Sequence, residues 1–431
     1  MDFQEKDARI ISIGIVLNGI QYDIQLTDIF EFYFIEDIYS FCMTGKLILL
    51  DRDGYFEFGP FTGSENDSLK VLYAIDEPSS GIELEFKIFK IEKSENAFGT
   101  YTGTSNVLTF ILVDDLFLKM TRHKWSRSFK EKYIHEIVEH ICMEMLETPI
   151  DVMIPTDQFY ELWYMPRWDA ATSIKWLMQR ASAGDDCGYL FYTNTQMRKF
   201  TRHFVSIEEL LKQGDLLIIE PNDDGIYRFF DSNITRVSKI KSWEITSIDE
   251  HARKHLQGNF CFGYDFERKK LIDSHEPLAP VLGETPGNSF IFYKDFIEKY
   301  VTVLGNKTLF HDISDPEADF INTGEDDEDI IKNYQAYDII KRYNIQQMLI
   351  ITVAGHENRY AGAMIEVEWP SFDKQKELYN RNLKGKYLIK SITHSFQPKN
   401  TQCYTQKLVC IKNGYYDSFN STLENAVKKN L

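Results

Sequence analysis

The first hundred or so residues alternate short apolar runs with polar turns, in the pattern of β-strands. The apolar runs span residues 46–51, 69–75, 82–91 and 107–113. Runs of this length, bounded by polar and glycine-containing turns, predict strands. Strands that follow one another at this spacing predict a β-barrel or a β-sandwich.

A helical pattern replaces this alternation between residues 116 and 220. The sequence at 128–131 fits a capping box, and the apolar positions after it recur every three or four residues until Pro149. Asp169 and Ser206 are expected to cap two further helices. This stretch is therefore predicted to be an α/β unit that follows an all-β unit.

Strands return in the second half of the chain, where apolar runs at 226–230 and 240–248 could complete the first β unit. Residues 271–288 contain prolines and glycines without periodicity and predict a connection. A second loop, 312–329, is rich in acidic residues and leads into a helix expected at 327–345. Its charge complements the dipole at the start of that helix, and a cation site is the alternative.

The last ninety residues are again predicted to be β, with strands at 348–353 and 364–369 and a long hairpin of 385–394 with 404–411. A similar hairpin layout occurs at 86–113. One interpretation is an internal repeat of two β domains; the other is that any two antiparallel hairpins look alike.

Three domains are expected from these patterns. They are a first β domain at 1–115 with its completion at 222–248, an α/β domain at 116–220, and a second β domain at 249–431 whose long connection covers 271–329.

Charge and composition exclude several classes of protein. The 431 residues include 66 acidic and 48 basic side chains, a formal net charge of −18, whereas a protein that wraps nucleic acid needs a basic face. The cluster at 122–127 mixes basic and aromatic residues and is interpreted as a solvated or interface loop. The charged N-terminus and the lack of an apolar run of about 18 residues predict a cytosolic protein without a membrane span. The six cysteines have neither zinc nor disulfide spacing.

The titratable residues predict no catalytic residue, no metal ligand and no cofactor. His135 and His140 are five residues apart, about 140° round a helix, whereas a zinc-binding helix needs histidines four apart. These two histidines are interpreted as solvent-facing. The two aspartates at 185–186 are interpreted as a solvated turn, and His394 as a hydrogen-bonded structural side chain. The sequence also lacks a nucleophile elbow and a phosphate-binding loop.

Three segments carry a resemblance to a known family: the strand and turn at 45–51, the helix and strand at 168–192, and the final hairpin at 385–409. They resemble the baseplate hub protein of contractile-tailed bacteriophages, whose relatives include the hub part of type VI secretion spike proteins. The resemblance implies an α+β, mainly β fold, with two related tube-like β-barrel domains, an α/β insertion domain and peripheral helices. It also implies a homotrimer, because three chains with two barrels each join a threefold spike to a sixfold tube.

The same resemblance implies a function and partners. It predicts a non-enzymatic structural virion protein of the tail baseplate, assembled in the host cytoplasm and active in viral genome ejection. Its implied partners are the tail tube protein, a central spike or spike-lysozyme protein, and baseplate wedge or peripheral tail proteins, with passive passage of DNA and no specific nucleic-acid binding. The alternatives are a cell-wall or metal-dependent hydrolase of the tail tip, and the hub of a phage-derived contractile injection system.

Eight apolar residues on the predicted strands are the candidates for the barrel core and for assembly. They are Leu47, Leu49, Phe110, Leu112, Leu388, Ile389, Ile392 and Leu408.

Overall fold

The computed structural model describes most of the first half of the chain and selected strands of the second half. The described residues are 9–17, 19–51, 67–74, 81–94, 106–184, 186–212, 217–221, 227–230, 236–237, 239–245, 261–265, 270–274, 337, 347–355, 359–367, 385–397 and 404–412. Within them the chain is mostly β with few helices, which confirms the mainly β class that the sequence predicts. Most of the predicted connection at 271–329 and of the helix at 327–345 lies outside the described residues.

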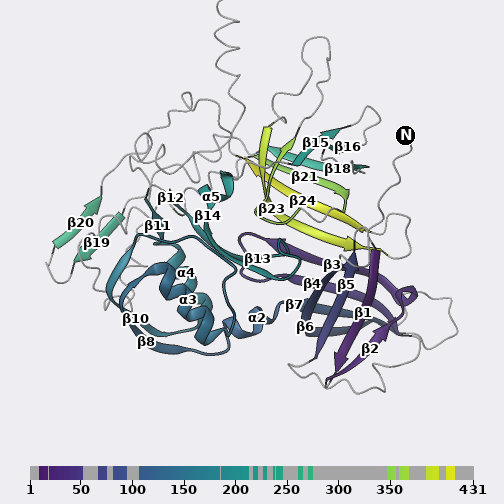
Figure 1. Cartoon of the computed structure of the whole chain (residues 1–431), viewed down its shortest axis with the longest axis horizontal. Helices are drawn as coiled ribbons and strands as arrows, with labels where there is room; N and C mark the ends of the chain where they lie inside the picture. Colours follow the sequence, from purple (N-terminus) through teal and green to yellow (C-terminus); the bar gives the residue numbers. More distant parts are fainter. Residues whose placement is uncertain are drawn as a thin grey trace, which may run out of the picture.

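Seven antiparallel strands form the N-terminal part of the largest sheet. In chain order they are β1 (Arg9–Leu17), β2 (Ile20–Ile24), β3 (Ile29–Asp37), β4 (Thr44–Asp51), β5 (Ser68–Ala74), β6 (Ile82–Ser94) and β7 (Asn106–Val113), with a short 3-10 turn, η1 (Leu26–Asp28), before β3. Their order across the sheet is β2-β1-β5-β6-β7-β4-β3. Alternate residues of these strands face one core, to which Ile13, Phe34, Leu84 and Phe110 contribute, because side chains along a strand alternate between its two faces. Figure 1 shows these strands curled together in purple and dark blue.

The C-terminal strands continue the same sheet. They are β15 (Leu217–Pro221), β16 (Tyr227–Phe230), β17 (Arg236–Val237), β18 (Lys239–Ile245), β21 (Gln347–Ala354), β22 (Met364–Val367), β23 (Gly385–Phe396) and β24 (Tyr404–Lys412). The predicted final hairpin is confirmed, since β23 and β24 pair antiparallel. The far half of β23 also pairs with β3, so this strand joins the two ends of the chain.

The returning strands pair differently from the expectation. β15 lies parallel to β22 and β18 antiparallel to β21, so both strands add to the C-terminal group and not to the first one. The described strands of 222–248 thus pair with the C-terminal group, and the division of the chain into domains stays a prediction. The cause is that apolar alternation marks a strand but does not specify which sheet edge receives it.

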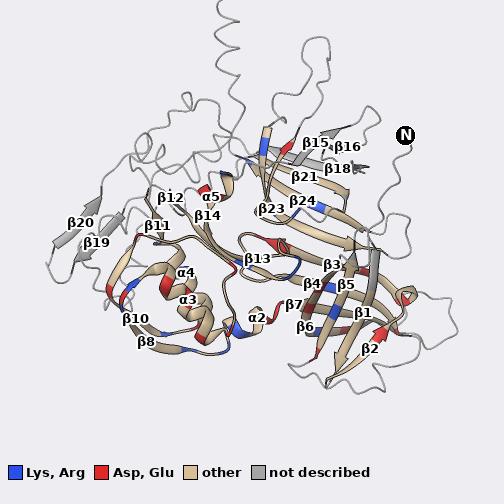
Figure 2. Cartoon of the chain, viewed as in Figure 1, with Lys and Arg blue, Asp and Glu red and all other residues tan. Residues whose placement is uncertain are grey.

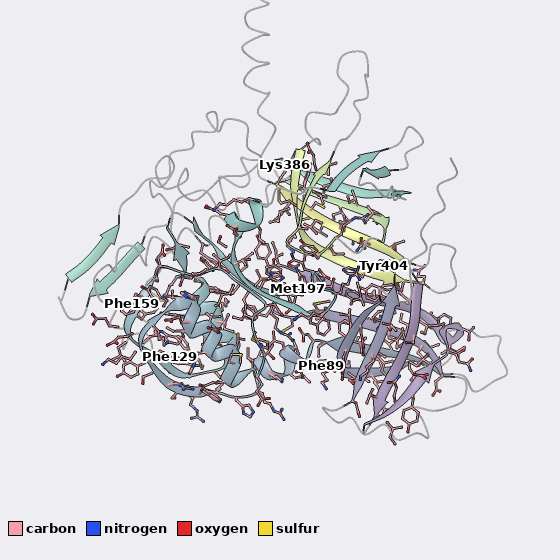
Figure 3. All side chains as sticks on the ribbon, viewed as in Figure 1. Phe89, Phe129, Phe159, Met197, Lys386 and Tyr404 are labelled. Carbon is pink, nitrogen blue, oxygen red and sulfur yellow. The ribbon has the colours of Figure 1, made fainter. Side chains whose placement is uncertain are left out.

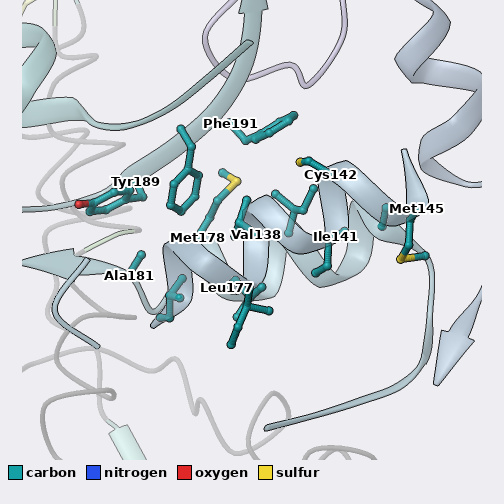
Figure 4. Close-up of a cluster of buried hydrophobic side chains, with 14 of the residues drawn as sticks. Val138, Ile141, Cys142, Met145, Leu177, Met178, Ala181, Tyr189 and Phe191 are labelled. Atoms are coloured by element: carbon teal, nitrogen blue, oxygen red, sulfur yellow. The ribbon is translucent and has the colours of Figure 1, made fainter. Parts of the chain in front are cut away.

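Residues 115–211 supply the helices and several short strands. These elements are α2 (Asp115–Met120), β8 (Trp125–Tyr133), α3 (Ile134–Met145), β9 (Val152–Met153), β10 (Phe159–Trp168), α4 (Ala170–Met178), β11 (Ser182–Ala183), β12 (Asp186–Cys187), β13 (Tyr189–Asn194), β14 (Thr201–Ser206) and α5 (Ile207–Leu211). A further two-stranded ribbon, β19 (Cys261–Asp265) with β20 (Lys270–Ser274), comes later in the chain. The apolar faces of α3 and α4 bury Val138, Ile141 and Leu177 in a second core that includes Phe191 of β13 (Figure 4).

Helix α3, the first helix that the sequence predicts, begins later than its pattern indicates. Residues 125–133 form strand β8, which pairs with β10, and α3 starts at Ile134. Glu136 caps the start of α3, where the Tyr133 N–H donates to Glu136 Oε2 over 3.0 Å. Phe129 faces Trp163 across the ribbon, a partner that is distant in the sequence and that local periodicity cannot reveal.

The other two predicted caps are confirmed. The Thr172 N–H donates to Asp169 Oδ1 over 2.8 Å at the start of α4, and the Glu209 N–H donates to Ser206 Oγ over 3.1 Å at the start of α5. Among the described helices, none combines the length and the apolar character that crossing a bilayer requires.

Candidate functional site: a buried polar junction

A carboxylate stands where the apolar stripe of β3 predicts another hydrophobic side chain. Phe32, Phe34 and Glu36 occupy alternate positions on the inward face of this strand, and Glu36 has no exposed surface. An ionised carboxylate is stable in such a place only when hydrogen bonds or opposite charges replace its water. The structure supplies these partners from two distant parts of the chain.

Glu36 accepts three hydrogen bonds. Its Oε1 accepts from the backbone N–H of Thr195 over 3.1 Å and from the Thr195 hydroxyl over 2.5 Å. Its Oε2 accepts from the backbone N–H of Ala361 over 2.8 Å. Thr195 directly follows β13 and Ala361 precedes β22, so one side chain fixes three segments that are more than 150 residues apart in sequence.

A chain of side chains leads away from Glu36 into the final hairpin. His394 Nε2 lies 3.2 Å from Glu36 Oε1, and His394 Nδ1 lies 2.7 Å from the Tyr404 hydroxyl. The Tyr404 hydroxyl can donate to Nδ1, whereas Nε2 makes no hydrogen bond to Glu36 despite this short distance. Gln406 Nε2 donates to the Tyr404 hydroxyl over 2.9 Å, and Arg359 Nη1 donates to Gln406 Oε1 over 2.8 Å. We call Glu36, His394, Tyr404, Gln406 and Arg359 the polar junction.

The polar junction has the carboxyl group of Glu36 at one end and the guanidinium of Arg359 at the other, and the hydrogen bonds from Arg359 to Gln406 and from Gln406 to Tyr404 run toward Glu36. Burial raises the pKa of the Tyr404 hydroxyl above its ordinary value, and nearby Glu36 adds to this shift, so the phenol stays protonated and can donate. Burial lowers the pKa of Arg359 to about 9, which leaves the guanidinium charged at neutral pH. The carboxyl group of Glu36 and the guanidinium of Arg359 therefore lie at opposite ends of this row of buried polar side chains.

A second group of polar contacts extends the junction toward β14. Asn194 Nδ2 donates to the Ala361 carbonyl over 2.9 Å, and its Oδ1 lies 2.9 Å from His203 Nε2. Burial lowers the pKa of His203 to about 4, against the opposing effects of Asp151 and Glu36, so this ring is neutral at physiological pH. Nε2 then carries the proton that Asn194 accepts.

Gly362 allows the close approach of this loop to β13. Its φ is +93°, and a Cβ placed on it would lie 2.4 Å from the hydroxyl of Tyr192. Both the backbone conformation and the space therefore require glycine at this position.

The polar junction is sealed from solvent, with Glu36, His394, Arg359 and Gln406 each at most 1% exposed. Because no substrate can reach these buried side chains, they cannot act on a substrate. What this arrangement does chemically is hold three chain segments in one relative position, at a cost that a purely apolar core would avoid. Among the described residues no group of His, Cys, Asp or Glu has the arrangement of a metal site.

The eight candidate core residues are all buried, in three different clusters. Leu47, Leu49, Phe110 and Leu112 share the first core, while Ile389, Ile392 and Leu408 share a core of the C-terminal strands. Leu388 packs in a third cluster with residues of β13 and α5, because it points to the opposite face of β23 from Ile389. Their role in assembly stays a prediction.

The other candidate segments have ordinary structural surroundings. His135 accepts from the Thr156 N–H over 3.0 Å, and His140 lies 3.0 Å from Glu144, so both half-buried histidines have partners and are not simply solvent-facing. Within the basic cluster, Arg127 forms an ion pair with Glu144 of α3. Asp185 lies outside the described residues.

Sequence patterns missed Glu36 and Arg359 entirely. The available signal was the position of Glu36 on the apolar side of a strongly alternating strand, since a lone carboxylate there must have buried partners. Arg359 had no comparable signal, because it lies in a loop.

Comparison with known proteins gives a result at the level of structure only. No family model matches the sequence, and no curated protein matches it. The fold is similar to that of a tail protein from Neisseria meningitidis MC58, with a TM-score of 0.53, 8% identity, and coverage of 94% of this chain and 98% of that one. It is also similar to a 43 kDa tail protein of prophage MuSo2 from Shewanella oneidensis, with a TM-score of 0.50, 9% identity, and coverage of 93% and 98%.

A third similar structure belongs to the Escherichia coli protein c3393, named as a component of the type VI secretion system, with a TM-score of 0.48 and 10% identity over 94% of this chain and 77% of that one. The first two similarities extend over nearly the full length of both chains. The chain therefore has the fold of phage-type tail proteins, and the resemblance predicted from the sequence is confirmed for the fold.

Proposed function

We propose that this protein is a structural, non-enzymatic hub of a phage-type tail, which adapts a threefold central spike to a sixfold tail tube. The observation that carries the proposal is the shared fold with two tail proteins over more than nine-tenths of this chain. In this proposal the protein works in the baseplate of the virion tail after assembly in the host cytoplasm. The sealed polar junction suits such a role, because a load-transmitting part needs its segments fixed relative to one another.

The symmetry argument requires two related β domains in each chain. Two hairpins support this relation: β6 with β7, and β23 with β24. Each is antiparallel and each contains one bulge in its first strand, between Ile88 and Lys90 in the former and between Ile389 and Ser391 in the latter. We propose that the N-terminal and C-terminal strand groups are two tube-like barrels, so that three chains present six equivalent positions.

The proposed domain division follows the observed pairing. The first barrel comprises residues 1–115, residues 116 to about 212 form the inserted α/β domain, and the strands from 217 onward belong to the second barrel. In this arrangement the eight buried core candidates stabilise the two barrels, and the inserted domain lies at the periphery. The tube protein, the spike and the surrounding baseplate proteins bind the assembled ring, and DNA passes through it without specific contacts.

The mass of the purified full chain tests the proposal. Native mass spectrometry is expected to give a particle of three times the 50.6 kDa chain mass. A stable monomer at micromolar concentration would contradict the trimeric hub. A basic stripe along the bore of the ring, together with salt-sensitive DNA binding, would contradict passive passage.

A further inference from the structure

The hairpin of β13 with β14 lies where three parts of the molecule meet. These are the α/β part at residues 115–211, to which the hairpin belongs, the first strand group of β1 to β7, and the second strand group of β15 to β18 with β21 to β24. Figure 1 shows β13 near the middle, with α3 and α4 on one side and β3 and β23 on the other. The six residues of β13 are all buried and none is charged, and the strand is tan along its length in Figure 2. Both faces of this strand are therefore covered by other parts of the chain.

The two faces of β13 contact different parts. Tyr189 and Phe191 lie in the core that contains α3 and α4. Leu190 and Tyr192 alternate with them along the strand and lie in a cluster with Leu388 of β23, in the second strand group. Separation of the α/β part from the second strand group would expose the apolar side chains of this strand to water, which is unfavourable.

The turn of the hairpin contacts the first strand group at two points. Phe200 packs against the first core, where its ring meets that of Phe86 edge to face with centroids 5.2 Å apart. At the other end of the turn, Thr195 donates its N–H and its hydroxyl to Glu36 of β3. Figure 3 shows Met197, which lies between Thr195 and Phe200 in the sequence, in the middle of the molecule, between the α/β part and the strand groups. One hairpin thus contacts all three parts.

Hydrogen bonds inside the turn fix its shape. The Arg198 N–H donates to the Thr195 carbonyl over 3.0 Å. The Met197 N–H donates to the Thr201 hydroxyl over 3.1 Å. Because these bonds brace the turn, Phe200 moves together with β13 and β14.

Further hydrogen bonds connect the hairpin to chain segments outside it. The Thr193 hydroxyl donates to the Phe41 carbonyl over 2.9 Å, in the connection between β3 and β4. Arg202 Nη2 donates to Asp114 Oδ1 over 3.3 Å, at the point where the chain leaves β7 for α2. With the contact of Asn194 to the loop before β22, these bonds link the hairpin to both strand groups. A displaced hairpin would leave several buried polar groups without partners, each at a cost in free energy.

We propose that this hairpin couples the three parts of the chain, so that the α/β part and both strand groups open and unfold as one cooperative unit. Each part opens alone only if the hairpin gives up its contacts with the other two, and the free energy of local opening therefore approaches that of the whole unit. The inference goes beyond the proposed function, because it concerns each single chain and holds with or without a trimer. In a tail hub, this coupling lets a protein bound at the α/β part restrain the strands of the ring.

Hydrogen exchange of the full-length chain, measured by mass spectrometry, tests the coupling. Leu177→Ala creates a cavity in the α/β core, where Leu177 of α4 is fully buried. It is expected to speed the exchange of the slowest amides of β3 and β23 by about tenfold or more, together with those of α3 and α4. Met143→Ala, at an exposed position of α3, is the matched control and is expected to change none of these rates. Faster exchange confined to the α/β part would mean that this part opens alone, and would overturn the proposal.

Substitutions in the hairpin form the second half of the test. Leu190→Ala with Phe200→Ser removes one contact with each strand group. In this background, the effect of Leu177→Ala on β3 and β23 is expected to be smaller by about threefold or more, while its effect on α3 and α4 is retained. Met197→Ser, in the same turn but 48% exposed, is the control and is expected to leave the full effect. The comparison is between rates with and without Leu177→Ala, so a general loss of stability does not imitate the result.

The outcome in the hairpin background decides the role of the hairpin. An effect of Leu177→Ala on β3 and β23 that stays complete there shows that another contact transmits it, and overturns the proposal. Circular dichroism checks that each variant is folded. If the double substitution prevents folding, Phe200→Leu alone replaces it. A partial loss of the effect on β3 is then expected, and a complete effect again overturns the proposal.

Discussion

The imidazole of His394 lies flat on the ring of Phe34, with centroids 4.2 Å apart and an interplanar angle of 12°. Phe34 belongs to the N-terminal strand β3 and His394 to the C-terminal strand β23, and the two residues are directly paired in the register of the sheet. The stacking holds the ring so that Nδ1 lies 2.7 Å from the Tyr404 hydroxyl and Nε2 lies 3.2 Å from Glu36 Oε1. The two ends of the chain are thus joined by a polar contact that an aromatic ring orients.

Replacement of Glu36 is expected to destabilise the protein strongly. Glu36→Ala leaves the N–H groups of Thr195 and Ala361 buried without an acceptor and removes the anion opposite Arg359, at a cost of about 3–5 kcal/mol. Glu36→Gln keeps one acceptor oxygen and is expected to cost less. Urea denaturation midpoints measure both, with the exposed Glu161→Gln as control. Equal midpoints for Glu36→Ala and the control would contradict the structural role of the junction.

The final hairpin was predictable because its signal is local. Alternating apolar residues on both sides of a polar loop marked β23 and β24 within a few residues of their ends. The start of α3 was not predictable in the same way. Residues 128–131 fit a capping box, but pairing with β10 outweighs that local preference and makes the segment a strand. Helix propensities of ordinary residues differ by roughly less than 1 kcal/mol per residue, whereas the pairing and partial burial of a strand contribute more stabilising free energy.

The contacts of the polar junction could not be predicted from the sequence for a related reason. Glu36, Thr195, Arg359 and His394 come from segments that approach one another only after the whole sheet has formed. The pairing of β23 with β3 is what brings them together, and no periodicity encodes that pairing. A buried carboxylate on β3 could have been noticed, but its partners could not have been named.

Gly362 offers a test of the loop that carries Ala361. Gly362→Ala is expected to lower the unfolding free energy by about 3 kcal/mol or more, because the φ of +93° is strained for alanine and the Cβ would meet the Tyr192 hydroxyl at 2.4 Å. Gly184→Ala is the matched control, since its φ is +56° and no atom lies within 4 Å of the added Cβ. The control is expected to cost only about 1 kcal/mol. Thermal unfolding of the two variants side by side separates the clash from the backbone strain.

His203 is expected to make the protein less stable in mild acid. Its folded pKa of about 4 is below the ordinary 6.5, so the unfolded chain binds a proton at this site before the folded chain does. Stability from this group is complete above pH 6.5 and decreases as the pH falls toward 4, with a slope of about 1.4 kcal/mol per pH unit. Comparison of His203→Gln with wild type between pH 7 and pH 4 checks this, because the variant lacks the titrating group. Parallel pH profiles would show that His203 is not held neutral by its surroundings.

The two histidines of α3 are expected to behave differently. His135→Ala removes the acceptor of the buried Thr156 N–H and is expected to cost about 1–2 kcal/mol. His140→Ala removes a half-buried pair with Glu144 and an edge-to-face contact with Phe129, and is expected to cost about 1 kcal/mol. Chemical denaturation gives both values, and elemental analysis of the wild type complements them. Stoichiometric zinc that disappears in the double variant would contradict the purely structural role.

A charge in the C-terminal core is expected to abolish the soluble assembly. Ile389 is fully buried among Leu349, Ile365 and Leu408, and its backbone N–H donates to the Ala363 carbonyl over 2.9 Å. Ile389→Asp would bury a carboxylate without a partner, which costs roughly 4 kcal/mol or more or forces the side chain to stay protonated.

The consequence of that cost extends beyond the second strand group. β23 pairs with β22, β24 and β3, so its displacement also removes the support of the polar junction and exposes strand edges to other chains. Met143→Asp, at a 53% exposed position of α3, is the control and is expected to change stability by no more than about 0.5 kcal/mol. Size-exclusion chromatography with light scattering distinguishes the outcomes: aggregated or absent Ile389→Asp protein is expected beside a normal trimer of the control. A soluble Ile389→Asp trimer of unchanged stability would show that this residue does not lie in the core of a barrel.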